Sequence, residues 1–472
     1  MIIPHEVGVP GLKKVLILLL FLPPASLILL SCGGYSSPSG GGSGIKYRAF
    51  ISNNVSAGTG LAGVYIVDAA NDVRGSISPI SAGTTPGMMV LTPNRTQTLV
   101  FSPGIDPLFP ENQFTIISNA GEAAAGQVPL PGSTESFVVS PDSSAAYVAV
   151  PTAKVTGQSP GIVEAISLGS GAATGQVDVP SAHYLSIDNS GNRILAFSDN
   201  SDSVAVITPS NIVTGNAVTS VGGFDRPVAA FFSSDDGTAY VLNCGAECGG
   251  QQSSIQQLDL THNTLIGTAV PVCTVDNTLK TQCAGSVFLV SGSTMYIAGT
   301  PYSAGGGPSL LCSTGTTTTQ ATYCGQLTIF DLSKMSVTNS TPIVITDGYH
   351  NRIALGANGQ LFIGAHTCTE IVPPVPPPTG AEVRGCLSIY NTQSVPVGNI
   401  QPGVVTIPPA TGDVTGIQPI ATRDVVYVVQ GHNVQGGTLY VYDTKTDAVD
   451  AVEEQKLSNL IGDFVDIKTI DF

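Results

Sequence analysis

The chain has 472 residues, of which only 11% are charged, while Gly (54) and Pro (33) are abundant. Long surface helices need many charged residues and Ala, so this composition favours short strands joined by turns. The net charge of −16 repels phosphate, and no basic stripe is interleaved with aromatic residues, so nucleic acid is not an expected partner. A hydrophobic content of 42% argues against disorder for most of the chain.

The first thirty-two residues carry an export signal. Lys13 and Lys14 precede an apolar run over residues 15–30, which ends in Leu-Leu-Ser-Cys. A membrane-spanning anchor is the alternative, but the run is broken by a Pro-Pro pair and is shorter than the ~20 residues of a span. The ending resembles the bacterial lipobox, and this resemblance implies that residues 1–31 form a signal peptide and that Cys32 carries the lipid, including palmitate.

The segment after the lipid site is rich in Gly and Ser. We expect residues 32–45 to form a flexible tether and residues 46–472 to form one domain. The residue after the cysteine is Gly33 rather than Asp, which in enterobacteria-like sorting implies the outer membrane. The expected location is therefore the bacterial cell envelope, as an outer-membrane lipoprotein that faces the periplasm or the surface.

The domain contains an internal repeat of a strand, a polar turn and a second strand. Asn94, Asp142, Asn189 and Asp235 occupy one position of this unit and are spaced 48, 47 and 46 residues apart. An Asn or Asp at this position can cap the turn with its own side chain. Such constant spacing predicts a repeat architecture.

Each unit continues with a third strand of alternating pattern. Eight of these are expected: 64–68, 114–118, 163–167, 204–208, 255–259, 327–331, 387–391 and 439–443. A weaker fourth strand usually follows. Four short strands per ~40–50 residues predict an all-β propeller of four-stranded blades, with eight blades expected and seven as the alternative.

The two chain ends complement one another. The first unit begins with 47–53, which has the pattern of a second strand, and the chain ends with 464–472, which has the pattern of a first strand. We therefore expect the terminal strands to share one blade, which closes the ring and removes exposed edges.

Two copies of the repeat carry a family resemblance, Ser140-Pro-Asp-Ser-Ser-Ala-Ala-Tyr-Val and Ser234-Asp-Asp-Gly-Thr-Ala-Tyr-Val-Leu-Asn. They resemble the YVTN-type propeller repeats of bacterial surface and envelope proteins. The resemblance covers about residues 46–472 and implies a fold and a class of binding surface rather than an activity. The chain has no Trp, which disfavours a typical WD40 propeller.

The cysteines after the lipid site are even in number, which in an exported chain predicts disulfides. Adjacency in the sequence favours Cys244–Cys248, Cys273–Cys283, Cys312–Cys324 and Cys368–Cys386. Eight cysteines permit 105 pairings, so the pairing stays open at this point. Three of these pairs would brace long loops, and the fourth would brace the connection from the fifth unit to the sixth, on the same face of the propeller. Zinc is disfavoured by the lack of Cys-x-x-Cys pairs.

Several polar residues map to the same rim, because they lie just before a first strand or just after a second strand. They are His183, His350, His366, His432, Glu135, Asp199, Asp225, Arg226 and Asp347. Solvated or capping roles are the ordinary alternative for each. Their clustering around a central funnel predicts a binding site.

The expected function is therefore a binding or scaffold module on the envelope that acts through the braced loops, with an envelope protein or glycan as partner. The alternative is a propeller hydrolase similar to lactonases, which would use rim residues for acid–base chemistry or metal binding. No haem-attachment, phosphate-binding, nucleophile-elbow or zincin motif is present. We therefore expect no cofactor, no metal and no catalytic residue, although the sequence does not decide whether the protein is an enzyme.

Overall fold

The computed structural model describes residues 42–54, 61–104, 108, 110–214, 217–275, 281–303, 307–308, 323–369, 385–398, 400–431, 437–460 and 462–471. Residues 39–472 form one compact unit, distinct from the residues before them. Within the described part of this unit, no helix has the length and apolar character that a membrane span requires.

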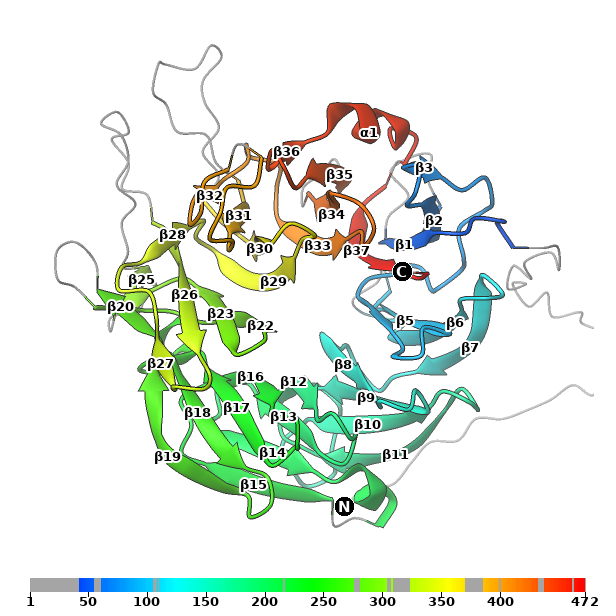
Figure 1. Cartoon of the computed structure of the whole chain (residues 1–472). Helices are drawn as coiled ribbons and strands as arrows, with labels where there is room; N and C mark the ends of the chain where they lie inside the picture. Colours follow the sequence, from blue (N-terminus) through cyan, green and yellow to red (C-terminus); the bar gives the residue numbers. More distant parts are fainter. Residues whose placement is uncertain are drawn as a thin grey trace, which may run out of the picture. The chain divides into compact units, whose positions relative to one another are not determined.

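Eight antiparallel sheets follow one another around a ring, so the unit is an eight-bladed β-propeller (Figure 1). From the centre of the ring outwards, blade 1 contains β37 (Phe464–Thr469), β1 (Arg48–Asn53), β2 (Gly63–Asp68) and β3 (Val73–Arg74), and the other blades follow the same order. Blade 2 contains β4 (Met89–Leu91), β5 (Gln97–Ser102), β6 (Gln113–Ser118) and β7 (Ala123–Pro129). Blade 3 contains β8 (Ser136–Val139), β9 (Ala145–Val150), β10 (Ile162–Ser167) and β11 (Ala172–Asp178). Blade 4 contains β12 (Ala182–Ile187), β13 (Ile194–Ser198), β14 (Ser203–Ile207) and β15 (Val218–Gly222).

The second half of the ring repeats this order. Blade 5 contains β16 (Pro227–Phe232), β17 (Thr238–Asn243), β18 (Ser254–Asp259) and β19 (Thr264–Pro271). Blade 6 contains β22 (Val287–Ser291), β23 (Thr294–Gly299), β26 (Gly325–Asp331) and an outer edge split between β27 (Ser336–Val337) and β28 (Ile343–Ile345). Blade 7 contains β29 (Tyr349–Leu355), β30 (Gln360–His366), β31 (Leu387–Asn391) and β32 (Val405–Thr406). Blade 8 contains β33 (Val414–Pro419), β34 (Val425–Gln430), β35 (Thr438–Asp443) and β36 (Ala448–Val449).

The repeat predicts this architecture well. The eight expected third strands are β2, β6, β10, β14, β18, β26, β31 and β35, each displaced by at most two residues at either end. The blade count is eight, which rules out the seven-bladed alternative. These third strands are buried on both faces, as in β2, β10 and β31, because each blade packs against a neighbour on either side.

The core is divided among the junctions between blades. Each of eight hydrophobic clusters joins two neighbouring blades. At the junction of blades 2 and 3, the rings of Phe114 and Phe137 meet edge to face with centroids 5.2 Å apart. Burial of such a side chain contributes about 1.5–3 kcal/mol, and the same packing recurs around the ring.

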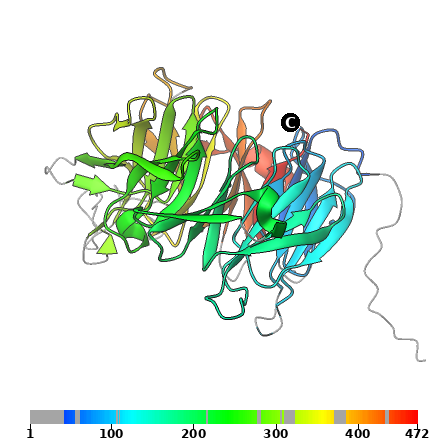
Figure 2. The same ribbon diagram turned by 90° about the horizontal axis from the view of Figure 1, so that it is seen from below.

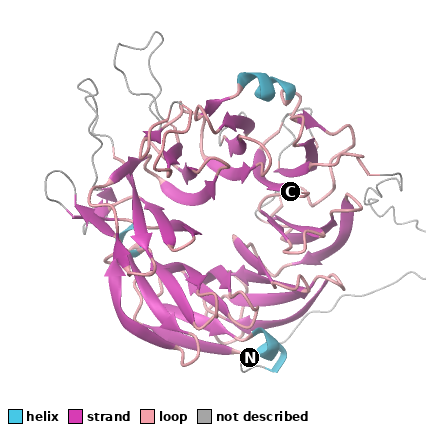
Figure 3. Cartoon of the chain, in the orientation of Figure 1, coloured by secondary structure: helices cyan, strands magenta, loops and turns pink. Residues whose placement is uncertain are grey.

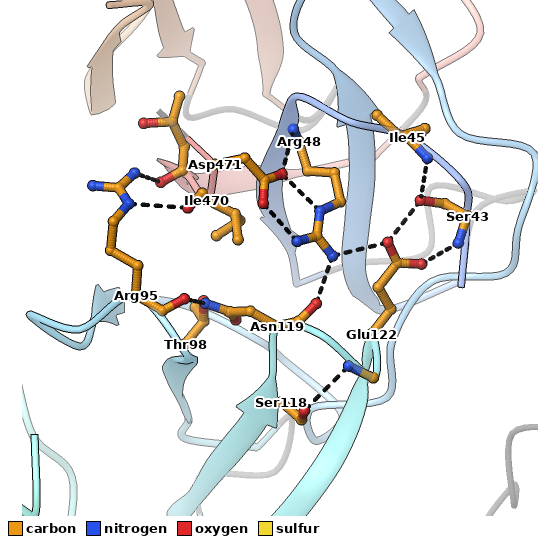
Figure 4. Close-up of polar contacts among 12 residues, drawn as sticks. Ser43, Ile45, Arg48, Arg95, Thr98, Ser118, Asn119, Glu122, Ile470 and Asp471 are labelled. Atoms are coloured by element: carbon orange, nitrogen blue, oxygen red, sulfur yellow. Dashed lines mark hydrogen bonds and ion pairs between the residues drawn. The ribbon is translucent and has the colours of Figure 1, made fainter. Parts of the chain in front are cut away.

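The terminal strands close the ring as expected. In blade 1, β1 pairs with β37, with Ile51 opposite Ile467. Arg48 lies beside this seam and donates to both carboxyl oxygens of Asp471, at 2.7 Å each (Figure 4). The same guanidinium contacts Oε1 of Glu122 in blade 2 at 3.0 Å. One arginine thus links the two ends of the chain to the next blade.

The ring has two distinct faces, each formed by one set of loops (Figure 2). We call the side where the innermost strands begin and the second strands end the cavity face. We call the opposite side, which holds the polar turns and the turns between third and fourth strands, the turn face. The strand order places the start of β1, and therefore the described residues just before it, on the turn face.

Residues at the end of the expected tether contact this turn face. The Ser43 hydroxyl donates to Glu122 Oε1 at 2.7 Å, and Ile45 packs against the cluster between blades 1 and 2 (Figure 4). The expectation that the tether is unpacked up to residue 45 is therefore wrong for these last residues.

The polar turns behave largely as the repeat predicts. Oδ1 of Asp142 accepts from the Ser144 backbone N–H at 3.0 Å, and Asn94 and Asp235 cap their turns in the same way. Asn189 differs, because its backbone and side-chain N–H groups both donate to Asp236 of the next blade.

The described chain contains little helix (Figure 3). The short helix α1 (Ala451–Lys456) connects blade 8 to the closing strand, and Asp450 caps it by accepting from the N–H groups of Val452 and Glu453. The 3-10 helices η1 (Pro209–Thr214) and η2 (Gly245–Cys248) lie in connections. The small hairpins β20 (Cys273–Val275)–β21 (Thr281–Cys283) and β24 (Tyr302–Ser303)–β25 (Gly307–Pro308) are additions to the repeat.

Candidate functional site

Disulfides brace the loops of the cavity face. Bonds join Cys244 to Cys248, Cys273 to Cys283 and Cys368 to Cys386, the pairs that adjacency favours. Cys324 is also disulfide-bonded. Its expected partner, Cys312, lies outside the described residues. Two of the described bonds lie after the second strands of blades 5 and 7, and the third closes the β20–β21 hairpin in the connection from blade 5 to blade 6. All of them therefore lie on the cavity face.

A central cavity of about 740 Å³ opens on this face. Its lining comes from the first residues of the innermost strands of most blades, together with ends of the second strands. Apolar side chains include Met88, Phe101, Leu185, Val287 and Phe288. Serine, threonine and asparagine groups lie between them, so the cavity suits a ligand with both apolar and polar parts.

The innermost strands carry a repeated β-bulge near their first residues. The register with the second strand shifts in blades 1, 4, 5, 7 and 8. The extra residues are Val465, His183, Val228, Asn351 and Thr415. A bulge turns a side chain out of the regular alternation. Three of these residues, Val228, Asn351 and Val465, line the cavity.

The bulge of blade 4 places His183 between two carboxylates. Its Nδ1 lies 2.6 Å from Oδ1 of Asp199, and its Nε2 lies 3.1 Å from Oε2 of Glu135 in blade 3. Burial alone would lower the pKa of His183, but the bonds and charges of the two carboxylates outweigh it and raise that pKa. The bond from His183 in turn lowers the pKa of Glu135. Hydrogen bonds thus link His183 to both carboxylates, and Glu135 lines the cavity.

Two tyrosines from distant blades meet beside this cluster. The hydroxyl oxygens of Tyr184 in blade 4 and Tyr349 in blade 7 are 3.0 Å apart. The Tyr184 ring stacks on His183 with centroids 4.1 Å apart. The pair lines both the central cavity and a second cavity of about 270 Å³, which also contacts Asp199 and Arg226. The two tyrosines therefore belong to the walls of both spaces.

A buried carboxyl lies in the loop after β17. Glu247 belongs to η2, within the ring closed by the Cys244–Cys248 disulfide, and its Oε2 accepts from the Thr300 N–H of blade 6 at 3.1 Å. Its Oε1 is buried and accepts no hydrogen bond in the described part of the chain. Burial raises the pKa of Glu247 to about 8, so the group holds a proton at neutral pH.

The structure contradicts the expectation for His350. This residue is 0% exposed rather than on the rim, because the bulge at Asn351 turns it into the sheet, where its Nε2 lies 3.0 Å from the Thr346 carbonyl oxygen. Burial lowers the pKa of His350 to about 4, so it is neutral. A rim role for His350 is therefore wrong.

The other expected rim residues divide into separate groups. His366 lies 3.4 Å from Asp413 at the junction of blades 7 and 8. The Asp225 carboxylate accepts from the backbone N–H groups of Gln251 and Gln252 and so holds the disulfide-braced loop of blade 5. Arg226 lies 3.6 Å from Asp202 and lines the smaller cavity.

Asp347 has a comparable local role, because it accepts from the N–H and hydroxyl of Thr369, beside the Cys368–Cys386 disulfide. His432 and Cys32 lie outside the described residues. Across the described ranges, no three His, Cys, Asp or Glu side chains are grouped in a way that could hold a metal ion.

Sequence reasoning missed Arg352, Tyr184 and Tyr349. They lie inside strands of ordinary pattern, and their approach to one space depends on ring closure. The bulges gave no sequence signal, because a one-residue shift does not interrupt a short apolar strand. The feature that could have indicated Arg352 is its charge within an innermost strand.

Comparisons with known proteins identify the fold. No family model matches the chain, and no curated protein matches it in sequence. Among solved structures, dihydro-heme d1 dehydrogenase NirN in complex with DHE is similar with a TM-score of 0.55 and 10% identity, over 94% of this chain and 78% of that one. The Kuenenia stuttgartiensis hydrazine synthase is similar with a TM-score of 0.50 and 12% identity, over 77% of this chain and 97% of that one. At such identities the likeness shows a shared propeller fold and nothing of activity.

Proposed function

We propose that the protein is a lipid-anchored binding module of the bacterial cell envelope and that it binds its partner through the cavity face. The observation that carries this proposal is that the described disulfides and the 740 Å³ cavity lie on one face. Loops held on a rigid scaffold are where such folds bind. An envelope protein or a glycan remains the proposed partner.

The position of the N-terminal segment supports this arrangement. Ser43 contacts Glu122 on the turn face, so the first described residues of the domain lie on the side opposite the cavity. This position is compatible with the proposal that the braced loops face away from the membrane.

A hydrolase is less well supported. The Asp199–His183 pair resembles an oriented general base, since the carboxylate fixes Nδ1 at 2.6 Å. However, the Nε2 that would accept a proton from substrate already contacts Glu135. Acid–base catalysis by His183 would require this contact to break, whereas binding of a partner would not.

The test uses the protein from residue 33 onwards, labelled and mixed with native envelope fractions. Ala229→Trp fills the cavity from an innermost strand, and Asn192→Trp places the same ring on the exposed turn face as the matched control. We expect Ala229→Trp to weaken binding at least about tenfold and Asn192→Trp to leave it unchanged. Equal binding by both variants would refute the cavity face as the binding face.

A further inference from the structure

The cavity holds one guanidinium in a fixed position. Arg352 of β29 is the only lysine or arginine among the described residues that line it. Its Nε donates to the carbonyl oxygen of Thr415, the bulge residue of blade 8, at 2.7 Å. Its Nη1 donates to the carbonyl oxygen of Asn351, the bulge residue of blade 7, at 3.0 Å. Two bulges thus present backbone carbonyls that orient this side chain.

The guanidinium retains unused donors. Arginine has five N–H groups, and these two bonds engage two of them. No carboxylate of the described residues forms an ion pair with Arg352, whereas Arg48 and Arg423 each pair with an aspartate. In a chain of net charge −16, an arginine directed by backbone oxygens and left without an acidic partner is suited to an anion from outside.

The opposite wall carries one carboxylate, whose Oε2 already contacts Nε2 of His183. Glu135 precedes β8 of blade 3 and is the only acidic residue of the described lining. Blades 3 and 7 face each other, because three blades separate them in either direction around the ring (Figure 1). Apolar side chains such as Phe101, Val287 and Phe288 lie in the lining between these walls.

From this juxtaposition we propose that the cavity binds a short peptide with free ends, its carboxylate at Arg352 and its ammonium group at Glu135. The planar guanidinium matches a carboxylate through paired N–H donors. A free phosphate would also suit Arg352, but it offers nothing to Glu135 or to the apolar lining. The inference rests on the proposed function, because it assumes that the cavity is the binding site, and it adds a small peptide ligand to the envelope protein or glycan proposed there.

The test compares trialanine with its C-terminal amide and its N-acetyl derivative, measured by calorimetric titration at millimolar concentration. The wild-type protein is expected to bind trialanine and to bind each blocked peptide at least about tenfold more weakly. Arg352→Gln is expected to abolish discrimination against the amide, and Glu135→Gln to abolish discrimination against the acetylated peptide. Arg193→Gln, on the turn face, is the matched control and should behave as wild type.

Several outcomes would overturn the inference. They are equal binding of trialanine and its amide, no binding of any of the peptides, or binding of inorganic phosphate alone with sensitivity to Arg352→Gln. The peptide comparison on wild-type protein does not depend on whether a variant folds. The proposed function is judged separately, because loss of envelope binding in Ala229→Trp would stand even if no peptide binds.

Discussion

Blades 2 to 4 and blades 5 to 8 show how one repeat can be kept regular or modified. Blades 2 to 4, the regular arc, have outer strands of five to seven residues and contain no cysteine. Blades 6 to 8 have outer strands of two residues, with an added three-residue strand in blade 6. Blade 5 keeps a long outer strand, but it begins the series of disulfide-braced loops. We call blades 5 to 8 the elaborated arc.

The two arcs hold their polar loops in place in different ways. In the regular arc, short turns bond to themselves or to the next blade, as Asn189 does with Asp236. In the elaborated arc, longer loops rely on disulfides and on buried polar groups such as Glu247 and Asp347. The cavity lies between the arcs, with Glu135 from the regular one and Arg352 from the elaborated one.

The largest expected effect concerns the buried carboxyl of the elaborated arc. Because the folded-state pKa of Glu247 is raised from 4.5 to about 8, the folded chain binds its proton more tightly, and stability falls as pH rises through that window. Glu247→Gln should match the wild type near pH 5 and exceed its stability by up to roughly 4 kcal/mol near pH 9. Denaturant unfolding across this range measures the difference.

The regular arc supplies the control for this measurement. Glu164 of β10 is also a buried carboxyl whose pKa is raised by burial. Glu164→Gln should show the same sign of pH dependence with a smaller amplitude. His350 acts in the opposite direction, since its pKa of about 4 makes stability fall as pH drops from 6.5, but this contribution cancels when each variant is compared with wild type. A stability difference between Glu247→Gln and the wild type that does not change with pH would contradict the raised pKa of Glu247.

The second-largest effect is the loss of a disulfide, which only the elaborated arc contains. The Cys368–Cys386 bond closes a loop with a sequence separation of 18, and replacing both cysteines with Ser should cost about 3 kcal/mol in the chain-entropy model. Hydrogen exchange should rise in β30 and β31 and stay unchanged in β9 and β13. The Cys244→Ser/Cys248→Ser variant, which opens a smaller ring, should lose less. Equal exchange changes in both arcs would show that the loops do not act locally.

The smallest effect tests the bonded turns at the boundary of the two arcs. Asp236 has a φ of 55°, and its carboxylate accepts from the backbone N–H groups of Asn189 and Ser190. Asp236→Gly permits this φ without strain, so the expected loss of about 1–2 kcal/mol reports the lost bonds between blades 4 and 5. Thermal unfolding measures it. An unchanged midpoint would mean that packing alone joins these blades.

Local sequence pattern was sufficient to predict much of the fold. The spacing of Asn94, Asp142, Asn189 and Asp235 predicted the repeat, and the third strands followed from their alternation. The three described cysteine pairs were predictable because their partners lie close together in the sequence. His183 and Glu135 were placed on one rim by counting strand ends, although their contact with Asp199 was not foreseen as a cluster.

The candidate site was less predictable, because it depends on which residues the ring brings together. His350 and Asn351 are adjacent, and only the bulge decides that the first is buried and the second lines the cavity. Tyr184 and Tyr349 are separated by 165 residues and meet only after closure.

The sequence by itself determined the repeat, its strand order, the closing strand and the side on which braced loops lie, because each depends on short-range alternation and turn chemistry. The tertiary structure alone decided how the innermost strands bulge, where Arg352 is directed and how the cavity is lined. The physical reason is that strands from distant parts of the chain form that wall, and each residue's exposure depends on its neighbours across the ring.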